Sequence, residues 1–256
     1  MSRLWPETVY IGLFPGYCWL RRERVAAEQS VESATSLESA AMLHTLEKML
    51  DEQSNPVQKG SRLVLTVSDS LGAIATLPWQ EELTRPTEIE GYAQVCFEKL
   101  GVTLGDNWVM HTEFRNYGGT GLAYALPREW LEALLELLNA RGLRLTAVLP
   151  VSAAAYCKQR FGRGDGRTLL LLQELNRASV IIYGSMGLLG YDVEPVTSSL
   201  EQTRMRLLNR VASAYNDITR VTYWSVDQSE SQPPVAPAPA CFPEVELCHL
   251  KRDAWN

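Results

Sequence analysis

The stretch RLVLTVSDSLGAIATLPW, residues 62–79, decides the fold class of this chain. It holds two apolar runs, rich in aliphatic and β-branched residues, separated by the polar break Ser-Asp-Ser at 68–70. A near-continuous apolar run of this kind is typical of a strand buried on both faces. The break favours a turn, because Ser and Asp side chains bond to the nearby backbone and Gly72 tolerates a positive φ. We therefore expect a central β-hairpin that ends at Pro78, which has no N–H to donate to a ladder.

The overall composition is that of an ordinary globular protein, with 46% apolar and 21% charged residues. The 256 residues are enough for one large domain or two small ones. There are 30 acidic and 24 basic residues, so the net charge is −6. This balance argues against a nucleic-acid partner, which would need a basic domain or stripe.

Neither a membrane-spanning segment nor a secretion signal is visible in the sequence. No run of about 18 uncharged apolar residues is present, and the N-terminus lacks a basic segment followed by an apolar one. We therefore expect a cytoplasmic protein whose five scattered cysteines are reduced thiols.

Hydrophobic periodicity predicts alternating strands and helices in the first part of the chain. Strands are expected at 8–13, 17–20, 108–114, 121–126 and 143–149, and helices at 36–53, 87–100, 127–138 and 151–159. The polar residues 24–36 are expected to form a loop. The helix near residue 90 has strong end signals: Thr87-x-x-Glu90 matches a capping box, and Gly101 suits the position after the last turn.

A second, similar pattern begins after the glycine-rich, charged segment 162–167. Strands are expected at 168–174, 178–183, 188–193 and 220–226, with a helix at 200–215. Residues 228–240 are Ser, Gln, Pro and Ala, which indicates a flexible or polyproline II segment. We therefore divide the chain into 1–161, 162–227 and a Pro-rich flexible tail at 228–256.

The two main parts share one order of elements: each opens with strands, passes into a helix and returns to a strand. Helix-linked strands favour an α/β architecture in which helices flank mixed sheets. By analogy, a duplicated strand-strand-strand-helix-strand order is the ribonuclease H-like plan that actin-like proteins contain twice.

No motif for phosphate binding is recognisable. Residues 116–121 contain three glycines, but no Lys-Ser/Thr pair follows them, so a hairpin turn explains them better than a P-loop. The pair Gly12 and Gly16 lies between two predicted strands, whereas a dinucleotide fingerprint lies between a strand and a helix.

Metal and nucleophile motifs are also missing. Cys241, Cys248 and His249 form the only cluster of soft ligands, and it is one ligand short of a closed zinc site. We expect a tail there rather than a metal site. No G-x-S-x-G elbow is present, and no cysteine has a recognisable catalytic context, so no catalytic residue is assigned.

Residues 62–150 resemble a family of short bacterial actin-like proteins related to the pilus-assembly protein PilM and to the cytoplasmic part of the type II secretion component GspL. The resemblance also extends, through order and a few positions, over most of residues 8–226. The matching positions are LVLTVSDSLGAIATLPW, Glu90-Gly-Tyr92-Ala93, Phe97, Trp108, Leu122-Ala-Tyr-Ala125, Leu131, Gly142-Leu-Arg-Leu145, Pro150, Leu171-Leu-Gln-Glu174, Ile182 and the helix at 200–215.

The resemblance implies a scaffold at the inner face of the membrane. Members without a membrane span are similar to PilM, which docks on a short cytosolic peptide of a membrane partner in a groove between subdomains. For this chain it implies a bitopic inner-membrane assembly protein as the partner, and peripheral membrane association only through that partner.

The resemblance also locates a cleft in which nucleotide-binding relatives hold ATP. Those relatives carry an Asp with small residues in the first hairpin, and another Asp with glycines in the second. Here the first turn is Leu-Phe-Pro-Gly, residues 13–16, without an acid and with a proline that lacks an amide. The second turn offers Glu174, Asn176 and Arg177, which is a poor set for magnesium.

We therefore treat Gly12, Gly16, Glu174, Asn176 and Arg177 as residues of a degenerate cleft and expect neither ATP nor magnesium to be bound. The favoured function is a non-catalytic scaffold. Two alternatives stay open: an active ATPase of the same class whose acids are Asp69 or Glu174, and a ribonuclease H-like nuclease, which would need several acids around metal ions.

Overall fold

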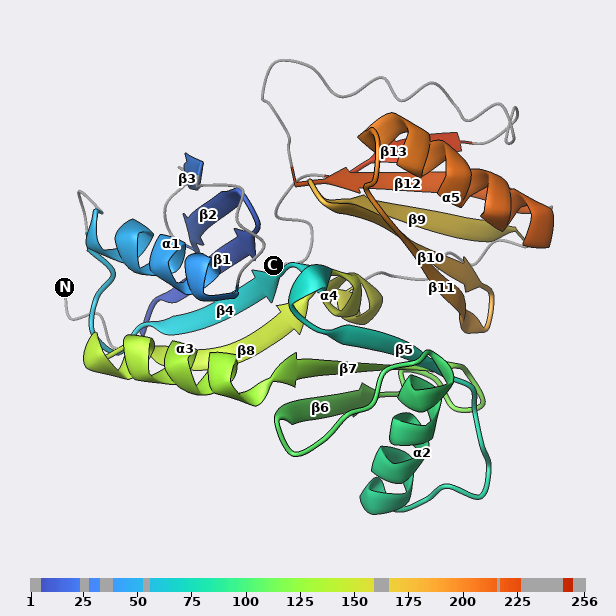
Figure 1. The fold of residues 1–256 in the computed structure, drawn as a ribbon, viewed down its shortest axis with the longest axis horizontal. Helices are drawn as coiled ribbons and strands as arrows, with labels where there is room; N and C mark the ends of the chain where they lie inside the picture. The colour runs from blue at the N-terminus through green and yellow to red at the C-terminus, as the bar shows by residue number, and fades with distance from the viewer. Residues whose placement is uncertain are drawn as a thin grey trace.

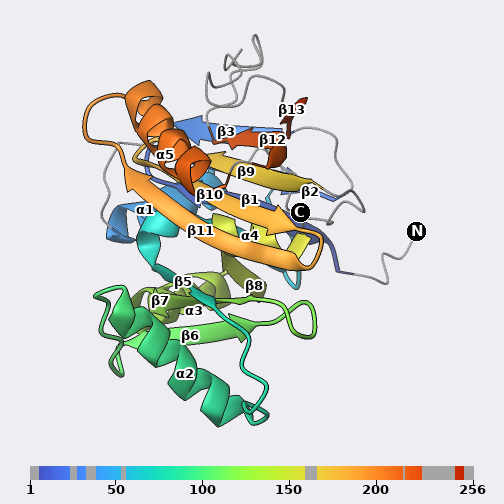
Figure 2. The ribbon, with the colours of Figure 1, turned by 90° about the vertical axis from the view of Figure 1, so that its right-hand side faces the viewer.

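The structure is a computed structural model that describes residues 6–23, 28–32, 39–52, 56–158, 166–215, 217–226 and 246–250. Three β-sheets form its framework, and helices cover their faces (Figure 1, Figure 2). Two of the sheets have five strands each and the third has three. This architecture confirms the predicted α/β fold class with mixed sheets and flanking helices.

The first five-stranded sheet has the order β3-β2-β1-β4-β8. Its strands are β1 (Thr8–Phe14), β2 (Tyr17–Arg22), β3 (Glu28–Glu32), β4 (Arg62–Val67) and β8 (Arg144–Pro150). Strand β1 is antiparallel to β2 and parallel to β4. Helices α1 (Ser39–Asp51) and α3 (Arg128–Ala140) pack against one face, where every second residue of β1 enters the core. We call this sheet and its helices the first half.

The second five-stranded sheet repeats the same arrangement in the order β11-β10-β9-β12-β13. Its strands are β9 (Arg167–Gln173), β10 (Arg177–Gly184), β11 (Gly187–Pro195), β12 (Ile218–Ser225) and β13 (Glu246–His249). Again the opening strands are antiparallel, and β12 returns parallel to β9. Helix α5 (Leu200–Ala214) covers the outer face. This second half confirms the duplicated ribonuclease H-like plan.

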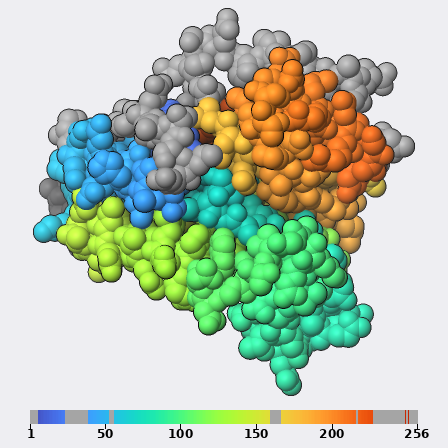
Figure 3. All heavy atoms as spheres, in the orientation of Figure 1, coloured from blue at the N-terminus to red at the C-terminus, as the bar shows by residue number. Residues whose placement is uncertain are grey.

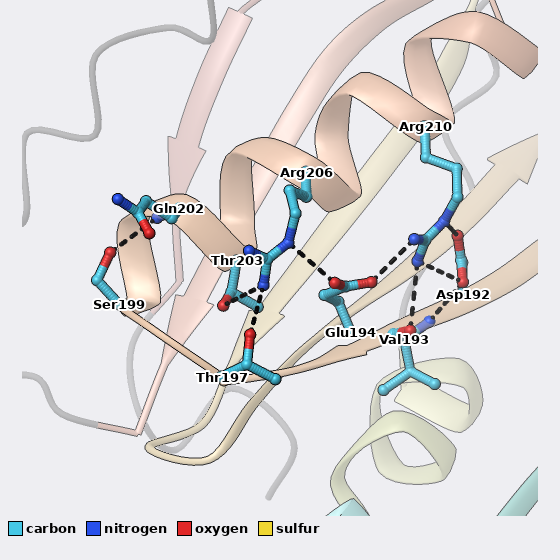
Figure 4. Close-up of polar contacts among 9 residues, drawn as sticks. All are labelled: Asp192, Val193, Glu194, Thr197, Ser199, Gln202, Thr203, Arg206 and Arg210. Atoms are coloured by element: carbon cyan, nitrogen blue, oxygen red, sulfur yellow. Dashed lines mark hydrogen bonds and ion pairs between the residues drawn. The ribbon is translucent and has the colours of Figure 1, made fainter.

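Helix α5 is fixed to β11 by ion pairs (Figure 4). Arg210 binds Asp192 at 2.6 Å and Glu194 at 2.8 Å, and Arg206 binds the other oxygen of Glu194 at 3.0 Å. The Ser199 hydroxyl caps the helix by accepting from the Gln202 amide. Both arginines are about half exposed, so these pairs set the register of the helix more than they add stability.

The three-stranded sheet is an insertion between β4 and α3. It has the order β5-β7-β6, with β5 (Ala73–Leu77), β6 (Trp108–Glu113) and β7 (Gly121–Pro127). Helix α2 (Pro86–Lys99) covers one face, and Phe97 and Ala93 pack against the small residues Ala75, Ala123 and Ala125. The predicted hairpin of β6 and β7 is confirmed.

The predicted central hairpin is wrong. Strands β4 and β5 belong to different sheets, and the short 3₁₀ helix η1 (Asp69–Leu71) carries the chain from one sheet to the other. The Ser68 hydroxyl accepts from the Ser70 amide and so caps η1. A Cβ at Gly72 would overlap the carbonyl oxygen of Ala125, so the glycine allows β5 to approach β7. The polar break therefore redirects the chain instead of reversing it.

Two local predictions also need correction. Residues 28–32, expected in a loop, form β3 at the edge of the first sheet, where no apolar alternation marks the strand. The predicted capping box of Thr87 and Glu90 is wrong. Helix α2 begins at Pro86, its N-cap is Arg85, and the Glu88 carboxylate accepts from the Arg85 amide at 3.1 Å. Proline takes the first helical position because its missing N–H costs nothing there. The predicted role of Gly101 is confirmed by its φ of 77°.

The predicted division of the chain falls largely outside the described residues. This holds for the boundary at 161/162 and for most of the tail at 228–256. Within the tail, Glu246–His249 form β13, which pairs in parallel with β12. None of the helices in the described residues is long and apolar enough to cross a membrane.

Helix α4 (Val151–Lys158) lies between the two halves (Figure 1). Its residues 151–156 are at most 1% exposed, and the three consecutive alanines 153–155 allow close packing. They share a core with Phe14 from the first half and with Leu170, Ile181 and Trp224 from the second. The space-filling view shows the stretch from β4 to β5, in teal, between the two halves (Figure 3). Burial of this core joins the halves.

Candidate functional site

The candidate site is the region where the β1–β2 turn of the first half and the equivalent β9–β10 turn of the second half meet helix α4 and the β4–β5 connection. We call this region the junction. The β1–β2 turn contains Gly16, whose φ of 78° requires glycine in this two-residue turn. The β9–β10 turn is closed by the Glu174 amide, which donates to the Arg177 carbonyl at 2.9 Å. Each turn joins the first two strands of its sheet.

Gly12 has a packing role within β1. It lies opposite Trp19 of β2, and a Cβ at this position would overlap the indole nitrogen of Trp19. The indole is 1% exposed. Gly12 is therefore needed so that the Trp19 indole can approach the backbone of β1 closely, as glycines in strands often permit.

An aromatic pair links the first turn to the second half. Phe14, the last residue of β1, is 1% exposed, and its ring centroid lies 5.7 Å from that of the fully buried Trp224. Trp224 belongs to β12 and is in register with Leu172 of β9. The rings are tilted by 47°, within the range of favourable aromatic pairs. The pair fills the space between the β1–β2 turn and the second sheet.

Asp69 connects three separate elements at the junction. One carboxylate oxygen accepts from the Ser152 amide at 3.0 Å, in the first turn of α4. The other accepts from the Ser152 hydroxyl at 2.5 Å and from the Ser179 hydroxyl of β10 at 3.4 Å. Asp69 is 1% exposed. A buried carboxylate is tolerated only with such partners, and the helix N-terminus adds favourable dipoles.

Glu174 meets Asp69 from the second half. Its Oε1 accepts from the Asp69 backbone amide at 3.2 Å, across 105 residues of sequence. Its Oε2 has no hydrogen-bond partner among the described residues, although the side chain is only 2% exposed. Nearby, the Tyr191 hydroxyl donates to Ser179 at 3.4 Å.

Burial makes both carboxyl groups harder to ionise, and the neighbouring Asp69 adds to this effect at Glu174. Burial, and then the neighbouring Asp69, raise the pKa of Glu174 to about 8, against opposing effects of Ser68 and Arg177. Burial also raises the pKa of Asp69, opposed first by the hydrogen bonds from Ser152. Burial raises the pKa of Tyr191 as well, so this phenol stays neutral. Such a pair titrates as a unit.

The structure brings together only part of the predicted set. Glu174 and Arg177 lie at this junction together with Asp69, and Asp69 and Glu174 are the two acids that the ATPase alternative names. Asn176 lies in the turn, and its buried side-chain oxygen has no hydrogen-bond partner within the described ranges of the chain. Gly12 and Gly16 are structural and make no part of the polar cluster. Because Asp69, Glu174 and Ser152 are each at most 2% exposed, the cluster joins elements rather than facing solvent.

Several junction residues were not identified from the sequence, namely Ser152, Ser179, Tyr191 and Trp224, and Phe14 was named only as part of the first turn. One signal was present, since Ser152 follows the strand-ending Pro150, where small residues begin a helix. The others carry no local signature, because ordinary core positions use the same residue types.

A second polar contact lies between the three-stranded sheet and the second half. The Asn116 amide donates to the Met186 carbonyl at 3.3 Å, and Thr120 bridges to Leu188. The glycine-rich segment 116–121 is a turn, as predicted, with Gly118 at φ 73°. Its glycines allow it to lie against the β10–β11 turn.

No group of three or more His, Cys, Asp or Glu side chains suited to a metal occurs in the part of the chain that the structure describes. Of the cluster considered from the sequence, Cys248 and His249 belong to β13 and Cys241 lies outside the described residues.

Comparison with known proteins gives structural matches only. No protein-family model matches the chain, and no curated protein matches it. It is similar to a PilM–PilN type IV pilus biogenesis complex, with a TM-score of 0.64, 13% identity, and coverage of 97% of this chain and 89% of that one.

Two further solved structures are similar to this chain in fold. A Bacteroides thetaiotaomicron protein with an actin-like ATPase fold and unknown function has a TM-score of 0.62, 11% identity, and coverage of 95% and 90%. The cytoplasmic domain of EpsL, an inner membrane component of the Vibrio cholerae type II secretion system, has a TM-score of 0.54, 14% identity, and coverage of 97% and 92%. At these identities the likeness concerns the fold, over nearly the whole of each chain.

Proposed function

We propose that this chain, whose fold is actin-like, is a non-catalytic scaffold of a pilus or secretion-type assembly and binds a membrane protein of that assembly. Two of the matched structures support the class. One is a complex of PilM with PilN in type IV pilus biogenesis, and the other is an inner membrane component of a type II secretion system. Both matches extend over 97% of this chain.

The observation that carries the non-catalytic part is the aromatic pair of Phe14 and Trp224. Nucleotide-binding relatives are expected to place small residues and an acid in the first hairpin turn, where phosphate is held. Here a buried phenyl ring occupies the start of that turn and contacts the opposite half at 5.7 Å between centroids. An apolar contact at this place supports a protein that uses the fold for binding rather than for phosphate transfer.

The ATPase alternative would need Asp69 or Glu174 to reach a hydrated metal ion. Both oxygens of Asp69 already accept hydrogen bonds from Ser152, and both carboxyl groups are at most 2% exposed. Magnesium keeps several of its waters and is held by carboxylates that it can reach. The burial of these acids therefore favours the scaffold.

The partner can be tested by sedimentation with membranes of the source cell. Purified chain is added to inverted inner-membrane vesicles, and the bound fraction is crosslinked and identified. We expect saturable binding and one crosslinked membrane protein with a cytosolic segment. Vesicles whose cytosolic segments have been removed by protease are the control, and binding to them should be lost. Equal binding to both vesicle preparations, or crosslinking to soluble enzymes alone, would contradict the proposal.

A further inference from the structure

The junction holds two carboxyl groups that receive very unequal numbers of hydrogen bonds. Asp69 accepts three, from the Ser152 amide, the Ser152 hydroxyl and the Ser179 hydroxyl. Glu174 accepts from the Asp69 amide at one oxygen, and the neighbouring Ser68 hydroxyl also favours its charged form, while its other oxygen has no partner among the described residues. Donors favour the charged form of a carboxyl group, and burial without donors favours the neutral form. A proton in this pair therefore resides mainly on Glu174.

The charged and titratable groups around the pair come from each element packed against it. Asp69 and the hydroxyl of Ser68 approach from the β4–β5 connection, and Arg177 acts on both carboxyl groups from β10. Helix α4 contributes Ser152, which carries no charge. Tyr191 of β11 faces Asp69 as a neutral phenol. Among the described residues, Arg177 is the cation that acts on both carboxyl groups, and it balances one negative charge, so a second charge would be buried without compensation.

These contacts join segments far apart in the chain. The bond from Asp69 to Glu174 links the first half to the second, and the bond to Ser179 does the same. Ser152 ties α4 to the same carboxylate. Any change that repels Asp69 from Glu174 therefore acts directly on the packing of one half against the other.

We propose that Glu174, buried beside the Asp69 carboxylate, carries a proton in the closed form, and that this proton is a latch that holds the two halves closed. Loss of the proton leaves two negative charges in a junction with almost no solvent access, and the junction opens so that water can reach Glu174. This inference does not depend on the proposed scaffold function, since it concerns only the conformation of the chain.

The direction of the pH effect follows from proton linkage. Burial and Asp69 raise the pKa of Glu174 to about 8 in the closed form, above its ordinary value of 4.5. In an open, hydrated junction the pKa of Glu174 returns towards that ordinary value. Between pH 4.5 and about pH 8, Glu174 is therefore protonated in the closed form and ionised in the open form. The equilibrium constant for opening then rises by up to about tenfold for each pH unit in this window and levels off above the upper limit.

Amide hydrogen exchange can measure this opening, because the Asp69 and Ser152 amides donate across the junction. Protection is followed by mass spectrometry in peptides covering 66–72 and 150–156, from pH 6 to pH 9, after correction for intrinsic exchange rates. A peptide from α2, residues 86–99, is the internal reference. We expect the junction peptides of the wild type to lose protection with rising pH while the reference peptide does not.

The variant Glu174→Gln keeps the shape of the side chain and cannot ionise. In this variant the junction should stay protected at all these pH values, whereas the control Glu98→Gln, on the exposed face of α2, should behave as wild type. Protection that is independent of pH in the wild type, or equally dependent on pH in Glu174→Gln, would overturn the proposal.

If Glu174→Gln does not fold, infrared spectroscopy of the wild type decides. A protonated carboxyl C=O band present at pH 6 and lost above pH 9 supports the latch, and absence of that band at pH 6 refutes it.

Discussion

Replacement of Phe14 by alanine tests whether the β1–β2 turn is packed against the second half or lines an open cleft. Phe14 is 1% exposed and pairs with Trp224 at 5.7 Å. Truncation removes a phenyl ring from a shared core that also contains α4. Because α4 and Trp224 are held by other contacts, the cavity should collapse only in part.

The expected cost follows from these contacts. Buried Phe to Ala substitutions cost about 3–5 kcal/mol of unfolding free energy, and we expect a value in this range. A double-mutant cycle with Trp224→Leu, which removes the second aromatic ring, should give a coupling of about 0.5–1.5 kcal/mol, the usual contribution of an aromatic pair beyond its buried area. Phe14→Leu retains most of the volume and should cost less than about 1.5 kcal/mol.

Urea unfolding followed by far-UV circular dichroism measures these values. The control is Met186→Ala, because Met186 is 69% exposed and its loss should change stability by no more than about 0.5 kcal/mol. A loss below about 1 kcal/mol for Phe14→Ala would mean that the ring faces solvent, and the reasoning about a filled cleft would then be wrong.

Three further predictions follow from single contacts. Gly12→Ala should destabilise the chain by several kcal/mol, because the new Cβ would overlap the Trp19 indole. Gly91→Ala in α2 has open space around it and should stabilise the chain by about 0.5–1 kcal/mol. Thermal unfolding of both variants measures the difference. Because the pKa of Glu174 is raised to about 8 in the folded chain, the folded state binds more protons than the unfolded state above pH 4.5, so the free energy of unfolding should fall from about pH 4.5 to about pH 8. Urea titrations at several pH values should show this slope in the wild type and a flatter one in Glu174→Gln. Arg210→Ala removes the half-exposed pairs with Asp192 and Glu194 and should cost less than about 1 kcal/mol, with a smaller effect at high salt.

Much of the fold was predictable because its signals are local. The strands and helix of the second half follow from periodicity within each element, and the repeated order then predicts the duplicated plan. The end of α2 at Gly101 also has a local cause, namely the positive φ that glycine permits. The edge strand β3 was missed, because a strand at the edge of a sheet can be polar on both faces.

The path of the chain between sheets was not predictable from residues 62–79. Turn-forming residues show where a chain bends, but the partner of the next strand is decided by packing. Here β5 pairs with β7, which lies almost 50 residues further along the chain. The close approach at Gly72 has the same non-local cause.

The junction was predictable only in part for the same reason. Glu174 and Arg177 were found because the resemblance located the second turn. The bonds that give Asp69 its role reach Ser152 across 83 residues and Glu174 across 105, and no short pattern encodes contacts over such separations. The aromatic pair of Phe14 and Trp224 is likewise a product of tertiary packing.

The central claim is that this chain uses an actin-like fold as a scaffold and does not bind nucleotide. Calorimetric titration of the full chain with ATP and magnesium tests this claim most directly. The account predicts no heat beyond dilution at any magnesium concentration. Saturable, magnesium-dependent binding with a micromolar dissociation constant would contradict it.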